Sequence, residues 1–363
     1  MSQTNNSNGV RSANQPAGGV VWSKGRPLRG VIVPLVMPLS GRDELDVPGL
    51  ERVVEHTLSG GVHGLFLLGT TGEASAICSR IRCEVVTRVC RRVRGRVPVM
   101  VGISDTSIVD SLRLADDAAR AGADAVVVTT PYYLPLEPRE LTSYVRAISR
   151  ESSLPVFLYN MPELTKAWMT TDVLAQLLDL DNVVGLKDSS GDVAYFHAAK
   201  TLMAHRPDWS LLLGSEVMMA DAVRQGAHGC VAGGANVWPQ LLVALYEAAL
   251  LDDHRMPALQ QQLVEMGQVY RFGAYAAGTI RGIKCALSLM SICSERMADP
   301  FLPATDAQRE DIAGVLRRLG LLGEEAANGT LTSRLEGSLQ SNRLYGSPAS
   351  PASPAAALAS SPQ

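Results

Sequence analysis

Short apolar runs recur along the chain from Gly30 to about Leu251, and an amphipathic segment follows each of them. The runs are Val31–Pro38, Leu65–Gly69, Val97–Ile103, Ala125–Thr130, Pro155–Asn160, Val183–Asp188, Leu211–Ser215 and Gly229–Gly233. Each run is too short for a helix and too uniformly apolar for a strand with one face in water. The pattern is therefore typical of buried parallel strands.

The segments between these runs predict helices. Ser107–Ala121 carries apolar residues on one side and charged residues on the other. Pro138 suits the first turn of another helix, and Asp172 is expected to cap a helix over Val173–Leu180. Even strand–helix units in series predict an α/β fold, a closed (β/α)8 TIM barrel. An open doubly wound sheet is the alternative.

The hydrophobic pattern continues beyond the barrel as a helical extension. Helices are expected over Gln260–Tyr270, Ile280–Ile292 and Ala307–Leu319. The two ends of the chain are polar or rich in Ser, Pro and Ala, and such segments cannot bury enough apolar surface to offset chain entropy. We therefore predict four segments: a disordered tail over 1–28, the barrel over 29–251, a C-terminal helical extension over 252–322, and a disordered tail over 323–363.

Composition narrows the class of protein without changing this fold. The 363 residues are 46% hydrophobic and 19% charged with a net charge of −3, which predicts a soluble enzyme that binds neither nucleic acid nor membrane. The cysteines lack C-x-x-C spacing and residues 1–28 lack a signal peptide's apolar centre, so we expect a cytoplasmic protein with reduced thiols. The histidines lack metal-binding spacing. The arginines between Arg88 and Arg96 predict a solvated helix face running into a turn.

Candidate chemistry lies at the carboxyl ends of the strands, where barrel enzymes carry their reacting groups. Lys187 ends a buried strand, and burial would depress the pKa of its amine toward neutrality. A neutral amine can attack a ketone and form an imine. A salt bridge with Asp188 is the structural alternative, which the alternation of side chains along a strand disfavours. Tyr159 ends the neighbouring strand, where a phenol can relay protons, the alternative being a core or rim tyrosine.

The loop Gly69–Glu73 offers two hydroxyls and glycines that expose backbone N–H groups. Such a loop can hold a carboxylate without a full positive charge. The structural alternative is a tight strand–helix turn in which Glu73 favours the start of the following helix.

Four motifs occur at successive strand ends: Gly-Thr-Thr-Gly-Glu (69–73), Thr-Pro-Tyr-Tyr (130–133), Tyr-Asn-Met-Pro (159–162) and Gly-Leu-Lys-Asp-Ser-Ser-Gly-Asp (185–192). In this order and spacing they resemble the dihydrodipicolinate synthase / N-acetylneuraminate lyase family of pyruvate-dependent class I aldolases. The resemblance covers about residues 29–322, including Arg281-Gly282-Ile283-Lys284 in the extension.

The resemblance implies a role for each matching residue. Lys187 would form the Schiff base and Tyr159 would relay protons. Thr70 and Thr71 would bind the pyruvyl carboxylate, with Thr71 also in a hydroxyl relay to Tyr159. Tyr133 would complete that relay from a neighbouring subunit.

The resemblance also implies a backbone contact from Val231 to pyruvate and a homo-oligomer, usually a dimer of dimers. It implies no metal or organic cofactor, because the protonated imine is itself the electron sink.

The second substrate is argued from departures within the family. The synthases bind the carboxylate of aspartate semialdehyde with an arginine, but Leu164 stands at that position and only Lys166 could substitute. Sialic acid lyases carry an acidic pair in the seventh-strand loop, whereas this chain has Glu216 followed by Val217. Their first loop also typically has serine where this chain has Thr70.

Ser189 followed by Gly214 and Ser215 is closer to the hydroxy-oxoacid and keto-deoxy-sugar-acid aldolases. Ser189 could meet the hydroxyl or aldehyde end of the second substrate, and the small Ser215 leaves room beside it. We predict cleavage or condensation of a 4-hydroxy-2-oxo acid, with pyruvate and a small aldehyde as the partners. Dihydrodipicolinate-type synthesis, sialic acid cleavage and keto-deoxy-sugar-acid dehydration remain alternatives. A non-catalytic 2-oxo acid sensor or scaffold and a phosphate-binding barrel are alternatives of other classes.

Overall fold

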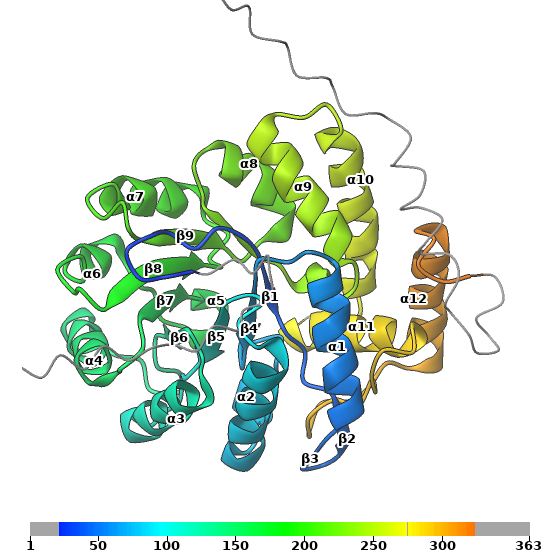
Figure 1. Ribbon diagram of the computed structural model, residues 1–363, viewed down its shortest axis with the longest axis horizontal. Coiled ribbons are helices and arrows are strands. Elements are labelled where there is room, and N and C mark those ends of the chain that lie inside the picture. Colours follow the sequence, from blue (N-terminus) through cyan, green and yellow to red (C-terminus); the bar gives the residue numbers. More distant parts are fainter. Residues whose placement is uncertain (1–21, 274, 324–363) are drawn as a thin grey trace, which may run out of the picture. The chain divides into compact units, whose positions relative to one another are not determined.

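The computed structural model describes residues 22–273 and 275–323. Within them, eight parallel strands close into a barrel, because the first strand pairs with both the second and the last barrel strand (Figure 1). The predicted TIM barrel is therefore confirmed and the open sheet is excluded. The predicted tails fall mostly on residues 1–21 and 324–363, which lie outside the described residues.

The barrel strands lie where the apolar runs predict them. They are β1 (Gly30–Pro34), β4 (Gly64–Leu67), β5 (Val99–Gly102), β6 (Ala125–Thr129), β7 (Val156–Asn160), β8 (Val183–Asp188), β9 (Ser210–Leu213) and β10 (Gly229–Val231). An antiparallel pair, β2 (Leu39–Gly41) and β3 (Glu44–Leu45), precedes the first helix.

Helices follow the strands around the barrel. They are α1 (Val47–Ser59), α2 (Ser79–Val93), α3 (Ile108–Ala121), α4 (Pro138–Glu151), α5 (Pro162–Thr165), α6 (Thr171–Ala175), α7 (Val193–Met203), α8 (Met219–Arg224) and α9 (Pro239–Leu251). The extension consists of α10 (Met256–Met266), α11 (Ala276–Leu289) and α12 (Asp306–Arg318). Short 3₁₀ turns are η1 (Ala74–Ala76), η2 (Glu216–Met218), η3 (Gly233–Asn236) and η4 (Gly267–Tyr270). No helix in the described part of the chain is long and apolar enough to cross a membrane.

The structure confirms one predicted helix-start signal, Pro138, and corrects another, Asp172. The Ser107 side chain caps α3 by accepting a hydrogen bond from the Asp110 N–H, and Pro138 is the first residue of α4. The predicted cap at Asp172 was wrong, because Thr170 is extended and its side chain accepts the Val173 N–H. Asp172 lies inside the first turn, and α6 ends at Ala175.

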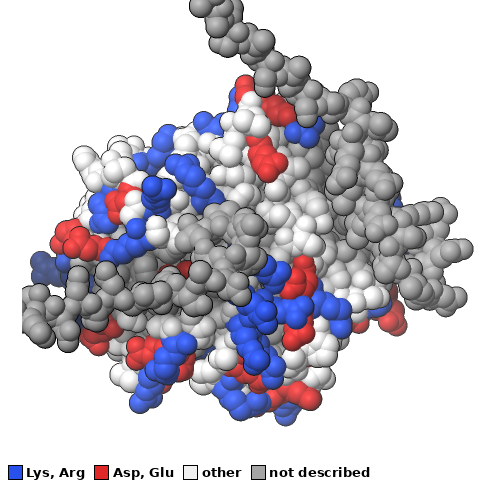
Figure 2. All heavy atoms as spheres, viewed as in Figure 1, with Lys and Arg blue, Asp and Glu red and all other residues white. Residues whose placement is uncertain are grey.

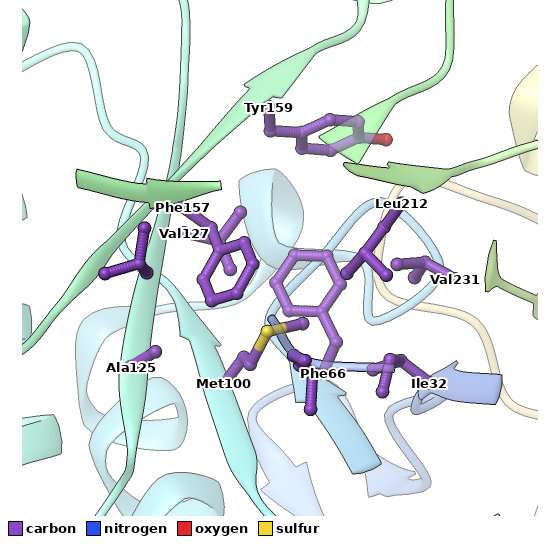
Figure 3. Close-up of a cluster of buried hydrophobic side chains, with 11 residues drawn as sticks. Ile32, Phe66, Met100, Ala125, Val127, Phe157, Tyr159, Leu212 and Val231 are labelled. Carbon is purple, nitrogen blue, oxygen red and sulfur yellow. The ribbon is translucent and has the colours of Figure 1, made fainter. Parts of the chain in front are cut away.

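The barrel interior is a packed hydrophobic core. Figure 3 shows aromatic and aliphatic side chains from successive strands meeting on the barrel axis, with Phe66 and Phe157 among the largest. Both rings are fully buried. Tyr159 belongs to the same cluster but lies at its edge (Figure 3). The core thus forms an apolar floor beneath the carboxyl ends of the strands.

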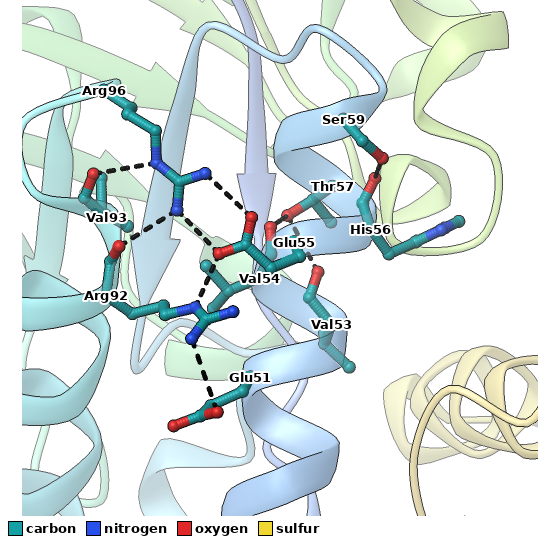
Figure 4. A network of polar contacts seen from close by, with 10 residues as sticks. All are labelled: Glu51, Val53, Val54, Glu55, His56, Thr57, Ser59, Arg92, Val93 and Arg96. Carbon is teal, nitrogen blue, oxygen red and sulfur yellow. Dashed lines mark hydrogen bonds and ion pairs between the residues drawn. The ribbon is translucent and has the colours of Figure 1, made fainter. Parts of the chain in front are cut away.

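Two of the arginines near the end of α2, Arg92 and Arg96, join it to the neighbouring helix α1. Arg96 binds Glu55 of α1 through two nitrogens, each 2.8 Å from a carboxylate oxygen, and Arg92 Nε lies 2.6 Å from the same carboxylate (Figure 4). These bonds outweigh desolvation and lower the pKa of Glu55 to about 2. Figure 2 shows acidic residues interleaved with basic ones over this face. The predicted solvated helix face is present. The helix α2 ends at Val93, and the backbone of the next residue, Arg94, lies in the left-handed region.

Candidate active site

Lys187 and Tyr159 lie side by side because of strand register. Tyr159, one residue before the end of β7, lies directly opposite Lys187 on β8. The Lys187 Nζ lies 3.9 Å from the centre of the Tyr159 ring and 5.0 Å from the centre of the Phe66 ring. Lys187 is 6% exposed and Tyr159 is 4% exposed. An amine, a phenol and an apolar floor therefore share one point at the carboxyl end of the barrel.

Asp188 does not pair with this amine. Its carboxylate accepts hydrogen bonds from Asn160 Nδ2 at 2.9 Å, from the Ser190 N–H at 3.1 Å and from the Ser190 hydroxyl at 3.0 Å. Burial raises the pKa of Asp188, and these three bonds oppose that rise. Among the described residues, no carboxylate forms an ion pair with Lys187, so the salt-bridge alternative is excluded there.

The hydroxyl that reaches Tyr159 is that of Thr70, whose Oγ1 lies 3.4 Å from the phenol oxygen. The resemblance assigns this contact to Thr71, so that expectation needs correction. The reason is the tight turn of the loop, in which the Gly72 N–H bonds the Gly69 carbonyl and the Glu73 N–H bonds the Thr70 carbonyl. Successive side chains of such a turn point in different directions.

The pKa of Tyr159 is lowered from its ordinary value near 10. Burial alone raises the pKa, but the positive charge of Lys187 and hydrogen bonding with Thr70 and Ser189 outweigh it. The phenol therefore gives up its proton more readily than a tyrosine in water. Such a group is suited to accept and return protons during a reaction.

A cavity of about 770 Å³ opens above the amine. Its walls include every predicted substrate-contacting and catalytic residue except Tyr133, namely Thr70, Thr71, Tyr159, Lys187, Ser189, Gly214, Ser215, Glu216 and Val231. A second chamber of about 390 Å³ adjoins it and shares Thr70, Tyr159 and Met161. Leu164 lines this second chamber together with apolar side chains.

Tyr133 lines neither chamber of its own chain. Its side chain is 89% exposed, and its backbone has a φ of 80°, in the left-handed region. The adjacent Leu134 is 71% exposed. A single chain therefore does not bring Tyr133 to Lys187, and its role across a subunit interface stays a prediction.

Gly214 and Glu216 shape the wall of the cavity through their contacts with neighbouring groups. A Cβ on Gly214 would lie 1.8 Å from the Ser189 Oγ, so only glycine leaves room for that hydroxyl. Glu216 accepts bonds from the Gly234 N–H at 2.7 Å and the Tyr270 hydroxyl at 2.8 Å. Burial raises the pKa of Glu216 despite these two bonds. Its carboxylate holds the extension against the barrel, a role that the sequence does not indicate.

Other contributors also escape sequence reasoning. Phe66 lies beside the Lys187 amine, but within its apolar run it is indistinguishable from any core residue. Glu73 pairs with Lys284 at 2.6 Å rather than simply favouring a helix start, and these residues are far apart in the chain. The described residues contain no group of three or more His, Cys, Asp or Glu arranged to hold a metal ion.

Most of the chain is similar to known proteins. Residues 27–319 match the dihydrodipicolinate synthetase family. The 4-hydroxy-tetrahydrodipicolinate synthase of Phenylobacterium zucineum is 35% identical over 296 residues, which cover 81% of this chain and 98% of that protein. The probable 2-dehydro-3-deoxy-D-pentonate aldolase YjhH of Escherichia coli is 30% identical, with 81% and 98% covered.

A solved structure gives the same result. The dihydrodipicolinate synthase of Bacteroides thetaiotaomicron is 43% identical, with a TM-score of 0.78, and the match covers 81% of this chain and 99% of that one. The resemblance seen in the four sequence motifs is thereby confirmed at the level of the family. The chain belongs to the dihydrodipicolinate synthetase family of pyruvate-dependent lyases and aldolases that work through a Schiff base on lysine.

Proposed function

We propose that this enzyme cleaves, or in reverse forms, a 4-hydroxy-2-oxo acid through an imine on Lys187. The observation that carries the proposal is the Lys187 amine 3.9 Å from the Tyr159 ring centre, beneath a cavity and without a carboxylate partner among the described residues.

The covalent steps balance without an added cofactor. After Lys187 has given up its proton, its Nζ adds to C2 of the 2-oxo acid. Loss of water gives an imine, and the imine nitrogen takes up a proton to form the iminium. The 4-hydroxyl gives its proton to a base, the C3–C4 bond breaks, and its electron pair moves into the iminium to form an enamine. An aldehyde leaves, C3 takes a proton, and water hydrolyses the imine to pyruvate and free Lys187.

Tyr159 is our candidate for the proton carrier in these steps. Its lowered pKa and its contact with Thr70 support that role. Thr71 and Val231 line the cavity. The side chain of Thr71 and the backbone of Val231 are our candidates for holding the pyruvyl end. Ser189 is our candidate for the hydroxyl or aldehyde end, and the small Ser215 leaves room for it.

Leu164 and Lys166 argue for this substrate over aspartate semialdehyde. Leu164 presents an apolar side chain to the second chamber, and it cannot pair with a carboxylate. The Lys166 Nζ donates to the Glu163 carbonyl oxygen at 2.5 Å. The similarity to the aldolase YjhH points the same way, although the identity to the two synthases is higher. Synthesis of 4-hydroxy-tetrahydrodipicolinate is therefore the competing function.

The environment of the enzyme is part of the same proposal. All six cysteines are free thiols, which fits a reducing cytoplasm. The exposed pair Tyr133 and Leu134 fits an interface between subunits, and we propose a homotetramer built as a dimer of dimers. In that dimer Tyr133 would reach the partner's Thr70.

Borohydride reduction in the presence of pyruvate tests the imine. Intact mass and peptide mapping are expected to show one pyruvyl adduct on Lys187 and none in Lys187→Ala. Lys200→Ala is the matched control, because Lys200 is an exposed helical lysine on α7. Lack of any adduct on the folded wild-type protein would overturn the proposal.

Turnover assays test the substrate. We expect pyruvate release from 2-dehydro-3-deoxy sugar acids and other 4-hydroxy-2-oxo acids. Rapid condensation of pyruvate with aspartate semialdehyde, without cleavage of hydroxy-oxo acids, would favour the synthase instead. Release of water from a deoxy sugar acid without release of an aldehyde would identify a dehydratase.

A further inference from the structure

The loop that carries Thr70 and Thr71 is held from behind by a buried ion pair. The Glu73 Oε2 lies 2.6 Å from the Nζ of Lys284 on α11, and neither side chain has any exposed surface. The Glu73 Oε1 accepts the Ala298 N–H at 2.8 Å. Both oxygens of one carboxylate therefore bind the helical extension rather than the barrel.

The same residue also fixes the turn of the loop. Glu73 has a φ of 53°, in the left-handed region, and its N–H donates to the Thr70 carbonyl at 3.0 Å. Gly72 packs tightly as well, because a Cβ there would lie 3.1 Å from the Leu35 carbonyl. A shift of the Glu73 carboxylate is thus passed directly to the peptide of Thr70, whose hydroxyl contacts Tyr159.

The helix that supplies Lys284 is itself immobilised beside the site. Ile280, one turn before Lys284, lines both chambers. Gly282 lies so close to the 3₁₀ turn η4 that an added Cβ would be 1.8 Å from the Val269 carbonyl oxygen. The helix α11 therefore offers Glu73 a fixed partner.

Energetics favour a role in positioning over a role in overall stability. Removing two charges from water is costly, and a buried pair replaced by well-packed neutral groups often leaves a protein as stable as before. The pair does, however, impose a short and directional contact that neutral groups of the same size cannot reproduce.

We propose that Glu73 and Lys284 are positioning residues, which set the orientation of Thr70 and Thr71 relative to Tyr159 and Lys187. The inference rests on the proposed function, since its readout is imine formation with pyruvate. It makes the C-terminal extension a working part of the active site. A misplacement of about 1 Å is enough to slow a reaction about 100-fold.

Three variants test the pair: Glu73→Gln, Lys284→Met and the double variant. The rate of adduct trapping is followed against pyruvate concentration, alongside thermal unfolding. We expect each single variant to unfold at a lower temperature and to lower the limiting trapping rate by roughly 10- to 100-fold. The uncharged double variant is expected to regain the wild-type unfolding temperature while its limiting rate stays at least about 10-fold low.

A matched control removes an exposed ion pair far from the site. Arg146→Gln breaks the pair between α4 and Asp179 and is expected to leave the trapping rate unchanged. If the double variant regains both the unfolding temperature and the rate, the pair is structural only and the inference fails. It also fails if all three variants are unfolded, because the fold itself then needs the pair. Lack of an adduct in the wild-type protein would instead overturn the proposed function.

Discussion

The two ends of the barrel use their polar groups, half-buried at the amino end and buried at the carboxyl end, in opposite ways. At the amino end, the Nδ1 of His63 accepts the Val31 N–H, and that of His228 accepts the Leu211 N–H. Asn182 donates to three carbonyl oxygens at that end. At the carboxyl end, Lys187 and Tyr159 contact each other and face a cavity. At the amino end these polar side chains are hydrogen-bonded to nearby backbone groups, whereas at the carboxyl end the reactive atoms are left free for a substrate.

The two ends also differ in how far along the chain their supporting contacts reach. Asn182 binds the carbonyls of Ser149, Ser152 and Leu154, which lie just ahead of the neighbouring strand. Glu73 instead binds Lys284, 211 positions away in the chain. A site that must leave its own atoms unbound takes its rigidity from distant segments. We therefore expect substitutions at the amino end to lower mainly the free energy of unfolding, and substitutions at the carboxyl end to lower mainly the catalytic rate.

Tyr159→Phe is expected to have the largest effect. Loss of the phenol removes the proposed proton carrier and should lower turnover by about 100- to 10,000-fold. The unfolding temperature should stay close to that of the wild type, because the ring is retained and the missing hydroxyl faces the cavity. Steady-state kinetics and calorimetry measure the two quantities. A loss of less than about 10-fold would remove Tyr159 from the mechanism.

Asn182→Ala removes hydrogen bonds at the amino end of the barrel instead. Three hydrogen bonds to carbonyl oxygens are lost, and we expect a free energy of unfolding about 2 to 3 kcal/mol lower. Trapping of pyruvate by the folded protein should proceed at the wild-type rate. Denaturant unfolding checks the first expectation. Slower formation of the adduct would show that the two ends of the barrel are coupled, which would contradict the separation of stability from activity.

Thr70→Val sharpens the distinction within the carboxyl end. Valine keeps the shape of threonine but cannot hydrogen-bond Tyr159, so we expect turnover to fall about 10-fold, equivalent to about 1.4 kcal/mol. The pKa of Tyr159 should rise, because a bond that lowers it is gone. A shift of the alkaline limb of the rate profile to higher pH measures this, and Thr70→Ser should restore it. An unchanged limb would contradict the assigned contact.

A last prediction concerns stability in acid and leaves the chemistry of the site untouched. Burial, aided by Arg29, lowers the pKa of His228 from 6.5 to about 4. Below pH 6.5 the unfolded chain binds a proton that the folded chain does not, so stability falls as pH drops from 6.5 to about 4. Protonation would also cost the bond from the Leu211 N–H. Unfolding free energies of His228→Asn should vary less with pH over this window, and an equal pH dependence would argue against His228 as the source.

Local patterns predict most of the fold and part of the site. The apolar runs locate every barrel strand that the structure describes, because a buried parallel strand needs apolar residues on both faces. Register then brings Lys187 opposite Tyr159. The cap of α6 was mistaken because Thr170 and Asp172 are both good capping residues, and side-chain geometry decides between them.

The remaining features depend on contacts that no local pattern records. Thr70 and Thr71 are equivalent in sequence, and only the turn of the loop sends the Thr70 hydroxyl to Tyr159. The pairing of Glu73 with Lys284 depends on how α11 packs against the barrel. Such tertiary contacts are set by the whole fold, so sequence motifs identify the residues but not their partners.

Closure of the barrel also limits how this protein can associate. Since β1 pairs with both β4 and β10, no barrel strand offers a free row of N–H and C=O groups to another chain. Among the described strands, open edges remain only on β2 and β3, which have 3 and 2 residues. Edge-to-edge aggregation therefore has little template in the folded state. Within residues 22–273 and 275–323, contacts between copies are therefore left mainly to the side chains of helices and loops, which substitutions can adjust without disturbing the barrel sheet.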